Sequence, residues 1–569
     1  MRSISVALLG CLLAAPIAAQ DRDSRADRSG LPRDVAREAT RLFNEPAAVR
    51  ASDRLDIDDD REIDGDVAVL NGPVIIGGHV KGRVLAINSD VVLRPTARID
   101  GDLLVVGGEV EGRHTAYIGG ETRIYRQQLQ YVREGDNIYP ERATLTASSE
   151  TAWWRNWERS HPRSGSKLQI ASAGAYNRVE GLPINLGPQV FINSGWGSAR
   201  LDAYAVLRTE SSFSGTSDDI GHNVNMELRF GRRGGVLVGG RLFNVVDPTE
   251  NWQLSELEAG LSAFVFRRDY RDYYARHGGR ARLGLFVRRG ADLSVSYGDE
   301  RWDSLTAQNP WTLTRQNAGW RPNPMFDQGR LHLVNGTLRI DTRNDAEDPW
   351  SGWYVLADLE NGRGTMLTYA PRSQPLTTPA AGPIQYGRGF LDLRRYNRVS
   401  PDAQLNVRVV AGGWLNGDAL PLQRRFAVDG PGALPGYDFR SPEASLALTC
   451  GLWAPGLAGQ CDRMALASVE YRGDLHFDLF TDWDDDHYMR SHANGVWVFF
   501  ADAGRGWLVG TPSTGDTMTY GRGELPPLST YKTDLGLGLD FDVFGVYVAK
   551  AMSAPKTPAN LFVRIRHRF

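Results

Sequence analysis

The chain has 569 residues, a net charge of −3 and a mean hydropathy of −0.36. The near-neutral charge gives no electrostatic basis for binding nucleic acid, and beyond residue 19 no apolar run is long enough for a membrane-spanning helix. The length indicates at least two domains, and the 62 glycines, 15 tryptophans and 20 tyrosines suit many tight turns and interfacial aromatic belts.

Residues 1–19 have the pattern of a secretory signal peptide. Arg2 provides a short basic start, an apolar run extends from Ile4 to Ala15, and small residues precede an expected cleavage site near Ala19. The apolar run is too short to span a bilayer as an anchor. The sequence therefore predicts an exported protein whose leader is removed.

Residues 20–50 are predicted to form a charged linker that contains one short helix. Between Pro32 and Phe43 the apolar side chains recur at helical spacing, and Pro46 ends the pattern. We expect this amphipathic helix to pack on the segment that follows it.

Residues 51–125 contain short alternating strands and a degenerate repeat. Gly65, Gly82 and Gly101 recur at intervals of 17 and 19 residues, and each follows Ile or Val by two positions. A repeat of this period predicts the stacked coils of a β-solenoid, with glycine at corners where the chain turns sharply. The segment resembles a short bactofilin-type (polymer-forming cytoskeletal) domain. The resemblance implies self-association, and a solenoid that serves only as a spacer is the alternative.

Residues 126–160 are predicted to be a polar connector, and residues 161–569 to form a barrel. Alternating segments separated by Gly, Pro and Asp turns continue to the C-terminus. Seventeen segments are candidate strands: 168–176, 189–195, 201–208, 223–230, 235–243, 258–265, 281–288, 292–297, 331–341, 353–360, 389–396, 404–414, 464–472, 496–503, 533–541, 546–551 and 561–569. A bacterial barrel whose termini share one side has an even number of strands, so one candidate must be incorrect. We predict an all-β fold, in which a short periplasmic β-solenoid precedes a sixteen-stranded transmembrane antiparallel β-barrel.

A glycine-rich segment between residues 421 and 441 has the most distinctive pattern in the chain. Its characteristic residues are Gly430, Gly432, Pro435, Gly436, Tyr437 and Arg440. The segment resembles the long sixth loop of the BamA/TamA-like superfamily (bacterial surface antigen family), which ends in an Arg-Gly-aromatic tip. Further similar motifs lie at 176–182, 340–343, 349–353, 469–472 and 498–504. The resemblance covers residues 165–569 and implies a BamA-like outer-membrane barrel.

The same resemblance implies that this loop folds into the barrel lumen and that its arginine pairs with acidic residues of neighbouring strands. Glu470 and Asp502 are the expected acidic partners, because each alternates onto the polar face of its strand. The family's arginine position holds Pro435 in this chain. We expect Arg440 to supply the guanidinium; the alternatives are a steric and aromatic lock, or ordinary solvated charges in a wet lumen.

After the leader, the chain has two cysteines, Cys450 and Cys461, which flank a Gly- and Pro-rich interval. An even number of cysteines in an exported protein predicts a disulfide that pins a surface loop. Two free thiols are the alternative.

The last nine residues have the pattern of a lipid-facing barrel strand. One face carries Leu561, Val563, Ile565, His567 and Phe569, and the other carries Phe562, Arg564, Arg566 and Arg568. The pattern resembles the C-terminal insertion signal of outer-membrane barrels, whose residues here are Ile565, His567 and Phe569. It implies contact with outer-membrane lipid and, during biogenesis, with the barrel assembly machinery. An amphipathic edge strand of a soluble sandwich is the alternative.

No motif in the sequence indicates catalysis, a cofactor or a metal site. We therefore expect a non-enzymatic protein of the bacterial outer membrane with its N-terminal domain in the periplasm. By resemblance, its expected function is insertion or translocation of proteins or lipids at that membrane. The alternatives are a structural anchor whose solenoid self-associates or binds peptidoglycan, and a passive pore.

Overall fold

In the computed structural model the chain divides into two compact units, Met1–Ala143 and Thr144–Phe569. The structure describes residues 31–140 and 164–569, apart from 32, 53, 126–127, 130, 135–136, 211–219, 232–233, 288–289, 344–348, 374–375, 377–380, 401–402, 442–445, 452–455, 482–488, 512–517, 542–543, 555 and 566–567. The predicted signal peptide at 1–19, residues 20–30 of the predicted linker and residues 141–160 of the predicted connector lie outside this set. Within it, no helix is long and apolar enough to cross a membrane.

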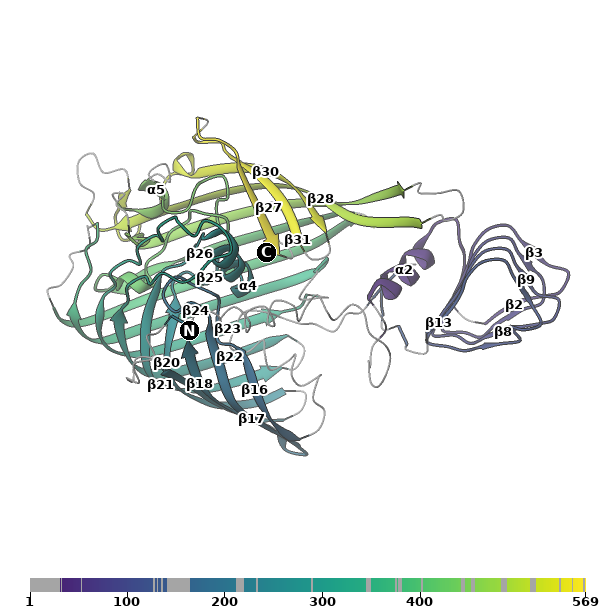
Figure 1. The fold of residues 1–569 in the computed structure, drawn as a ribbon, viewed down its shortest axis with the longest axis horizontal. Helices are drawn as coiled ribbons and strands as arrows, with labels where there is room; N and C mark the ends of the chain where they lie inside the picture. The colour runs from purple at the N-terminus through teal and green to yellow at the C-terminus, as the bar shows by residue number, and fades with distance from the viewer. Residues whose placement is uncertain are drawn as a thin grey trace. The chain divides into compact units, whose positions relative to one another are not determined.

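The first unit contains the predicted β-solenoid, and its strands form three parallel sheets (Figure 1). The sheets have the orders β1-β4-β7-β10-β13, β11-β8-β5-β2 and β12-β9-β6-β3. The strands are β1 (Val49–Ala51), β2 (Leu55–Ile57), β3 (Glu62–Ile63), β4 (Val67–Leu70), β5 (Val74–Ile76), β6 (His79–Val80), β7 (Val84–Ile87), β8 (Val91–Leu93), β9 (Arg98–Ile99), β10 (Leu103–Val106), β11 (Val110–Glu111), β12 (Tyr117–Ile118) and β13 (Thr122–Tyr125). Val67 pairs with Val84, and Val84 pairs with Leu103, so the sequence repeat is the coil repeat.

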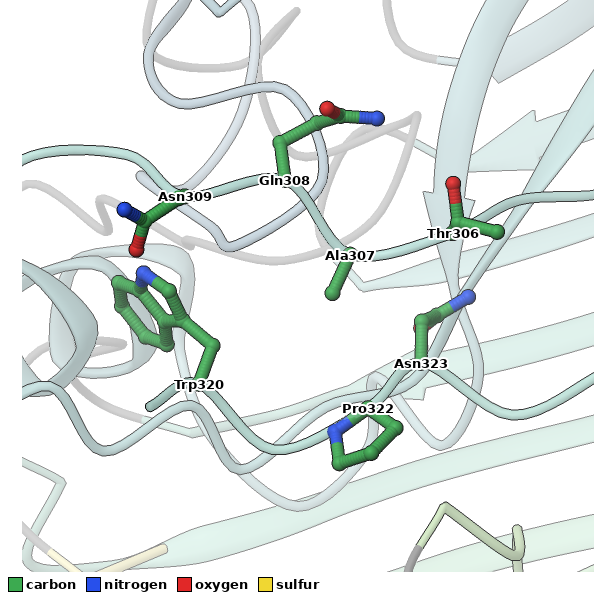
Figure 2. A pocket seen from close by; sticks show the side chains of 7 residues that line it. All are labelled: Thr306, Ala307, Gln308, Asn309, Trp320, Pro322 and Asn323. Carbon is green, nitrogen blue, oxygen red and sulfur yellow. The ribbon is translucent and has the colours of Figure 1, made fainter. Parts of the chain in front are cut away.

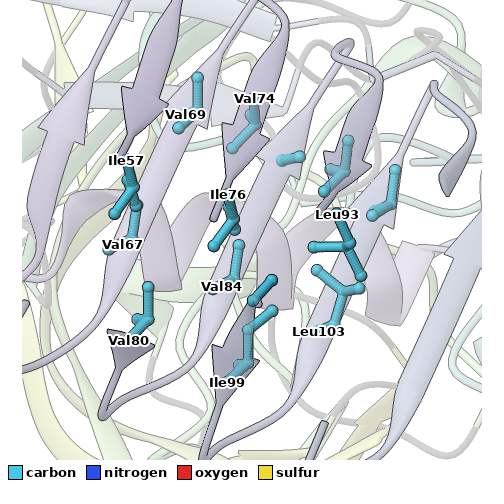
Figure 3. Packing of buried hydrophobic residues seen from close by; sticks show 14 of the residues in the cluster. Ile57, Val67, Val69, Val74, Ile76, Val80, Val84, Leu93, Ile99 and Leu103 are labelled. Carbon is cyan, nitrogen blue, oxygen red and sulfur yellow. The ribbon is translucent and has the colours of Figure 1, made fainter. Parts of the chain in front are cut away.

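Aliphatic side chains stacked coil on coil fill the solenoid interior (Figure 3). Val67, Val84 and Leu103 are each at most 1% exposed. The recurring glycines lie at a corner where successive coils approach too closely for a side chain. A Cβ at Gly82 would lie 2.4 Å from the carbonyl carbon of Gly65, and a Cβ at Gly101 would lie 2.8 Å from that of Gly82. The glycine repeat therefore sets how closely the coils stack.

Helix α2 (Arg33–Asn44) packs on the outer face of the sheet formed by β4, β7 and β10. The hairpin of β14 (Tyr131–Glu134) and β15 (Asn137–Pro140) completes this cluster. The Asn44 side chain donates to the carbonyl of Ile138 at 2.7 Å and accepts from its N–H at 2.9 Å. The connector predicted over 126–160 therefore includes a folded hairpin, which the polar composition of the region concealed.

The second unit is one large antiparallel sheet that curves into a barrel (Figure 1). The sheet contains seventeen strands, but one of them, β29 (Thr519–Tyr520), has only two residues and runs parallel to β28. Because β30 pairs directly with β28, β29 is not part of the antiparallel series. The other sixteen strands form the antiparallel barrel that the sequence predicted. They are β16 (Gly165–Ser172), β17 (Pro183–Ser194), β18 (Gly197–Arg208), β19 (Ile220–Phe230), β20 (Gly234–Pro248), β21 (Tyr273–Val287), β22 (Ala291–Ser304), β23 (Gln328–Asp341), β24 (Gly352–Thr368), β25 (Gly382–Ser400), β26 (Ala403–Gly417), β27 (Arg463–Thr481), β28 (Met489–Val509), β30 (Lys532–Phe541), β31 (Phe544–Ala551) and β32 (Asn560–Ile565).

Side chains alternate between an apolar outer face and a polar inner face. In β22, Leu293 and Val295 are 51% and 54% exposed, whereas Ser294 between them is 7% exposed. The same alternation places Leu561 and Val563 outside and Arg564 inside. This is the pattern of a barrel that presents hydrocarbon to lipid and polar groups to its interior.

The candidate strand at 258–265 is the incorrect one, because this segment lies in helix α4 (Glu256–Phe266). The Ser255 hydroxyl accepts from the N–H of Glu258 at 3.3 Å, and the Glu258 carboxylate accepts from the N–H of Ser255 at 3.1 Å. This capping box, Ser-x-x-Glu, fixes the helix start. The residues at 257, 259, 261 and 263 are apolar and alternate as in a strand, and for this reason the sequence pattern predicted a strand here.

The connections between strands alternate between two ends of the barrel. At the end that carries the long connections we name loop 1 (173–182), loop 3 (249–272), loop 4 (305–327) and loop 6 (418–462). Loop 3 contains α4. Loop 6 contains the 3-10 helix η2 (Leu422–Arg424), the short helix α5 (Leu446–Thr449) and the glycine-rich segment. The 3-10 helix η3 (Leu528–Thr530) precedes β30.

Candidate functional site

Loop 6 folds back against the inner face of the sheet. Val428, Leu434 and Tyr437 are at most 3% exposed and belong to a cluster that includes Val410 of β26 and Leu466 of β27. The chain reverses at its tip through a bridge between residues 430 and 434, where the φ of +90° at residue 430 requires glycine. Loop 6 is therefore part of the barrel interior rather than a solvated surface loop.

The tip of loop 6 docks on the last three strands. The N–H of Gly436 donates to Asp534 Oδ2 of β30 at 2.6 Å, and the carbonyl of Pro435 accepts from Asn560 Nδ2 of β32 at 3.1 Å. A Cβ at Gly436 would lie 2.7 Å from the amide nitrogen of Ala551 in β31. A Cβ at Gly432 would lie 2.4 Å from the carbonyl oxygen of residue 253 in loop 3. Both glycines therefore allow a backbone contact that any side chain would obstruct.

Arg440 anchors the base of this tip to loop 3. Its side chain is 6% exposed, and its Nη1 lies 2.6 Å from Asp429 Oδ1. Its Nη2 pairs with Glu250 and lies 3.5 Å from Asp272 Oδ2. The guanidinium also lies 4.5 Å from the centroid of the Phe439 ring. Arg440 therefore supplies a buried guanidinium, but its pairs are with loop residues.

Asp272 extends this cluster to loops 1 and 4. Its Oδ1 lies 3.0 Å from Nη2 of Arg178 in loop 1 and 2.5 Å from Nη2 of Arg321 in loop 4. Arg178 is fully buried and also pairs with Asp269 at 2.9 Å. Four loops are therefore joined through one network of charge-assisted hydrogen bonds.

Burial and charge act in opposite directions on the acids of this network. Burial raises the pKa of Glu250 to about 7, although Arg440 acts to lower it. For Asp272 burial also acts upward, but the guanidiniums of Arg321, Arg440 and Arg178 together hold its pKa below the ordinary value. Asp272 is thus the ionised acid at the centre of the network, and Glu250 is the acid that titrates near neutral pH.

Glu470 and Asp502 face the barrel interior, at 2% exposure each, and form a second cluster. Asp502 pairs with Arg568, whose Nη2 lies 2.6 Å from Asp502 Oδ2. Glu470 pairs with Arg472 at 2.9 Å, and Arg568 Nη1 lies 3.9 Å from its Oε2. Arg440, which we expected beside these two acids, pairs with Glu250, Asp429 and Asp272 instead. The loop 6 tip nevertheless lies near Asp502: Gly436 donates to Asp534, and Asp534 is the cross-strand partner of Asp502 where β30 pairs with β28.

Helix α4 contacts both loop 1, which follows the first strand β16, and the last strand β32. Glu256 Oε2 accepts from the N–H of Ala175 in loop 1 at 2.7 Å. Glu258 Oε1 accepts from Arg564 Nε at 2.6 Å and from the N–H of Ile565, the last residue of β32, at 3.0 Å. Among the described strands, no ladder joins β16 to β32. We call the junction between these two end strands the seam.

Cys450 and Cys461 form a disulfide, and both residues are fully buried. The pair packs on β28, since a Cβ at Gly506 would lie 2.1 Å from Cys461 Sγ. The predicted disulfide is therefore present, but it joins two parts of loop 6 that are buried against the barrel wall rather than an exposed loop.

Of the predicted insertion-signal residues, Ile565 ends β32, Phe569 lies beyond the strand, and His567 is outside the described residues.

A hollow in loop 4, of about 350 Å³, is lined by Thr306, Ala307, Gln308, Asn309, Trp320, Pro322 and Asn323 (Figure 2). Asn323 is already engaged: its amide donates to the carbonyls of Tyr273 and Leu305 at 2.8 Å, and its oxygen accepts from Arg178 at 3.1 Å. Arg267 lies 4.8 Å from the Trp320 ring centroid. These contacts join loop 4 to loop 1 and to the start of β21.

The sequence interpretation missed several residues of these clusters, among them Glu250, Asp269, Asp272, Arg321 and Asp534, and it placed Arg568 on the polar face of the last strand without naming its partner. Glu250 and Asp272 lie on either side of residues 258–265, which were predicted to be a strand. The sequence interpretation therefore did not identify loop 3 as part of the barrel interior. The Ser-x-x-Glu capping box at Ser255 was the available signal.

A comparison with protein-family models agrees with this architecture. The Omp85 superfamily domain matches residues 221–543. Solved structures with similarity include BamA from Haemophilus ducreyi lacking POTRA domains 1–3, with 13% identity, coverage of 77% of this chain and 89% of that chain, and a TM-score of 0.40. CdiB from Acinetobacter baumannii has 12% identity, coverage of 73% and 67%, and a TM-score of 0.31. CdiB from Escherichia coli has 12% identity, coverage of 77% and 66%, and a TM-score of 0.32. A search of curated proteins finds no match.

Proposed function

The chain belongs to the Omp85 superfamily, and from this premise we propose that it inserts proteins into, or translocates them across, the bacterial outer membrane. The observation that carries the proposal is the seam. β16 and β32 are the end strands of the sheet, with eight and six residues, and no ladder joins them among the described residues. Unpaired strand edges in a membrane are unfavourable unless another group satisfies their backbone, so they are sites where a further strand can pair.

The filled interior favours this function over a passive pore. Loop 6 and loop 3 occupy the inner side of the barrel: Leu434 and Tyr437 are buried against it, and Arg440 joins the two loops. A pore for free diffusion needs an open, polar lumen. We therefore expect low single-channel conductance in a planar bilayer. The proposed activity also needs no catalytic group, because strand exchange and translocation break no covalent bond.

The solenoid supports a second candidate function, an anchor that associates through the coil ends. β1, β2 and β3 are end strands of their sheets within the described residues, and Val49 of β1 is 42% exposed. Exposed strand edges pair readily with other edges. A periplasmic location of this unit, and an edge contact with a second copy or with peptidoglycan, form part of this proposal. Filaments in electron micrographs of residues 31–140, or their co-sedimentation with sacculi, would support it.

Reconstitution tests the main proposal. Vesicles that contain the purified protein should accelerate membrane insertion of an unfolded outer-membrane barrel added from urea, as measured by protection from protease. Protein-free vesicles and vesicles with Gly336→Ala, which meets no atom within 4 Å, are the controls. Equal insertion rates with and without the protein would contradict the proposal.

A further inference from the structure

We propose that α4 is a latch that holds the barrel seam closed, and that its release from β32 regulates opening of the seam. This inference rests on the proposed function for its purpose, but its geometry stands by itself. α4 belongs to loop 3, between β20 and β21, and neither of these strands is next to an end strand in the strand order. The helix nevertheless contacts groups at both ends of the sheet.

On one side, Glu258 occupies hydrogen-bonding groups of the last strand. Its carboxylate accepts from the backbone N–H of Ile565 and from the guanidinium of Arg564. Glu258 is 8% exposed and Arg564 is 5% exposed. The Ile565 N–H lies on an edge strand, where it would otherwise be offered to a neighbouring strand. The carboxylate thus takes the place of the next strand's carbonyl, with the extra strength of a charged acceptor.

On the other side, the same helix is joined to loop 1, which directly follows β16. Glu256 accepts from the N–H of Ala175 at 2.7 Å. A Cβ at Gly260 would lie 3.0 Å from the amide nitrogen of Tyr176, so the helix backbone packs directly on loop 1. The Phe264 and Tyr176 rings meet edge to face, with 5.2 Å between centroids. α4 therefore bridges the two sheet ends that have no ladder between them.

The attachment of α4 to β32 has fewer contacts than its attachment to loop 1, so we expect the contact with β32 to break when the seam opens. Packing, a ring contact and a hydrogen bond attach α4 to loop 1, and the salt bridge between Glu256 and Arg271 at 2.7 Å joins its first turn to the end of loop 3. The described contacts with β32 centre on one carboxylate, that of Glu258. Removing that carboxylate should free the edge of β32. It also removes the acceptor of the Ser255 N–H, but packing, the ring contact and the Glu256 hydrogen bond still hold α4 on loop 1.

Distance measurement across the seam tests the latch without any client protein. Leu168→Cys in β16 and Leu561→Cys in β32 place spin labels on outward-facing positions that are 73% and 67% exposed. The two cysteines that follow the predicted leader, Cys450 and Cys461, are engaged in their disulfide and do not compete for the label. Pulsed electron paramagnetic resonance of the labelled protein in nanodiscs then measures the distance between the two end strands.

We expect one narrow distance distribution in this labelled protein and a second, longer population after Glu258→Ala. The matched control is Glu227→Ala on β19, which removes a carboxylate of 4% exposure that pairs with Arg229 at 2.8 Å, away from the seam. An unchanged distribution with Glu258→Ala, or equal broadening with both substitutions, would overturn the latch. If Glu258→Ala does not assemble, Glu258→Gln is the second variant: its amide oxygen still caps α4, but the charge-assisted bond to Arg564 is lost, so the longer distance population should again appear.

The seam distance tests the latch, and the rate of client insertion tests the proposed function, so the two proposals can be contradicted separately. A latch without insertase activity would give the second distance population but no acceleration of client insertion. An insertase without this latch would accelerate insertion equally with and without Glu258→Ala, and its seam distance would not change.

Discussion

Arg568 Nη2 lies 2.6 Å from Asp502 Oδ2, and the same guanidinium lies 3.6 Å from the centroid of the Phe500 ring. This pair holds the chain beyond β32 on the inner face of β28. Asp502 is also the neighbour of Asp534, the carboxylate that receives the loop 6 tip. Two chain segments, the loop 6 tip and the carboxyl end, therefore meet at adjacent acids on the same inner wall.

We predict that Arg568→Ala destabilises the barrel. The substitution leaves Asp502, which is 2% exposed, without its cation. Breaking a buried pair by removing one partner typically costs about 3–5 kcal/mol. The temperature at which the heat-modified band appears in electrophoresis should fall accordingly. Arg330→Ala is the matched control, since Arg330 is 70% exposed in its pair with Asp299 and such surface pairs contribute about 0–1 kcal/mol. Equal shifts for the two variants would contradict the prediction.

We predict that Gly436→Ala displaces the tip of loop 6. The added methyl would lie 2.7 Å from both the amide nitrogen of Ala551 and the Cβ of Asp534, and neither neighbour is the free end of a flexible side chain. Overpacking of this kind costs about 1–3 kcal/mol. Limited proteolysis should then cleave loop 6 faster than in the wild type. Gly336→Ala on β23, with no atom within 4 Å, should leave the cleavage rate unchanged.

Much of the fold could be predicted because its determinants are local. The two-residue alternation of β22 and β32 reports which face each side chain occupies, and the glycines at 65, 82 and 101 report where coils touch. These patterns follow from backbone geometry and need no knowledge of distant partners. The sixteen-stranded barrel and the solenoid were accessible for this reason.

The site could be predicted only in part because its partners are distant in sequence. Glu250 and Arg440 are separated by 190 residues, and Glu258 and Arg564 by 306. The pattern around Arg440 showed that a guanidinium was available but not which acid it would meet. α4 was taken for a strand because alternating apolar residues suit both a strand and a fully packed short helix, and tertiary packing decided between them.

We predict that Glu250 makes barrel stability depend on pH near neutrality. Burial raises its pKa from 4.5 to about 7. The folded state therefore holds its proton more tightly than the unfolded state, and the free energy of unfolding falls as pH rises from about 4.5 to about 7. Asp272, whose pKa is lowered, contributes only below its ordinary value of 3.8.

Glu250→Gln should reduce this slope by up to about 1.4 kcal/mol per pH unit relative to the wild type. Urea unfolding in lipid vesicles at pH 6 and pH 7 measures the change. Burial raises the pKa of Glu180 in loop 1 to about 6, so the reduction attributable to Glu250 is clearest above that value. Parallel slopes for wild type and Glu250→Gln between these two pH values would show that Glu250 titrates normally.

We predict, last, that Gly82→Ala destabilises the solenoid although it adds a single methyl group. The new Cβ would lie 2.4 Å from the carbonyl carbon and oxygen of Gly65 in the preceding coil, so the two coils must separate locally. Separation lengthens the parallel hydrogen bonds near this corner and loosens the contact of Val67 with Val84, and overpacking of this kind costs about 1–3 kcal/mol. Thermal unfolding of residues 31–140, followed by circular dichroism, measures the loss. Lys81→Ala is the adjacent control: Lys81 is 45% exposed and pairs with Glu62 and Asp64 on the surface, where such pairs contribute about 0–1 kcal/mol. If Gly82→Ala unfolds at the wild-type temperature, the glycine repeat does not set the coil spacing, and the stacked Val and Leu side chains alone would have to account for it.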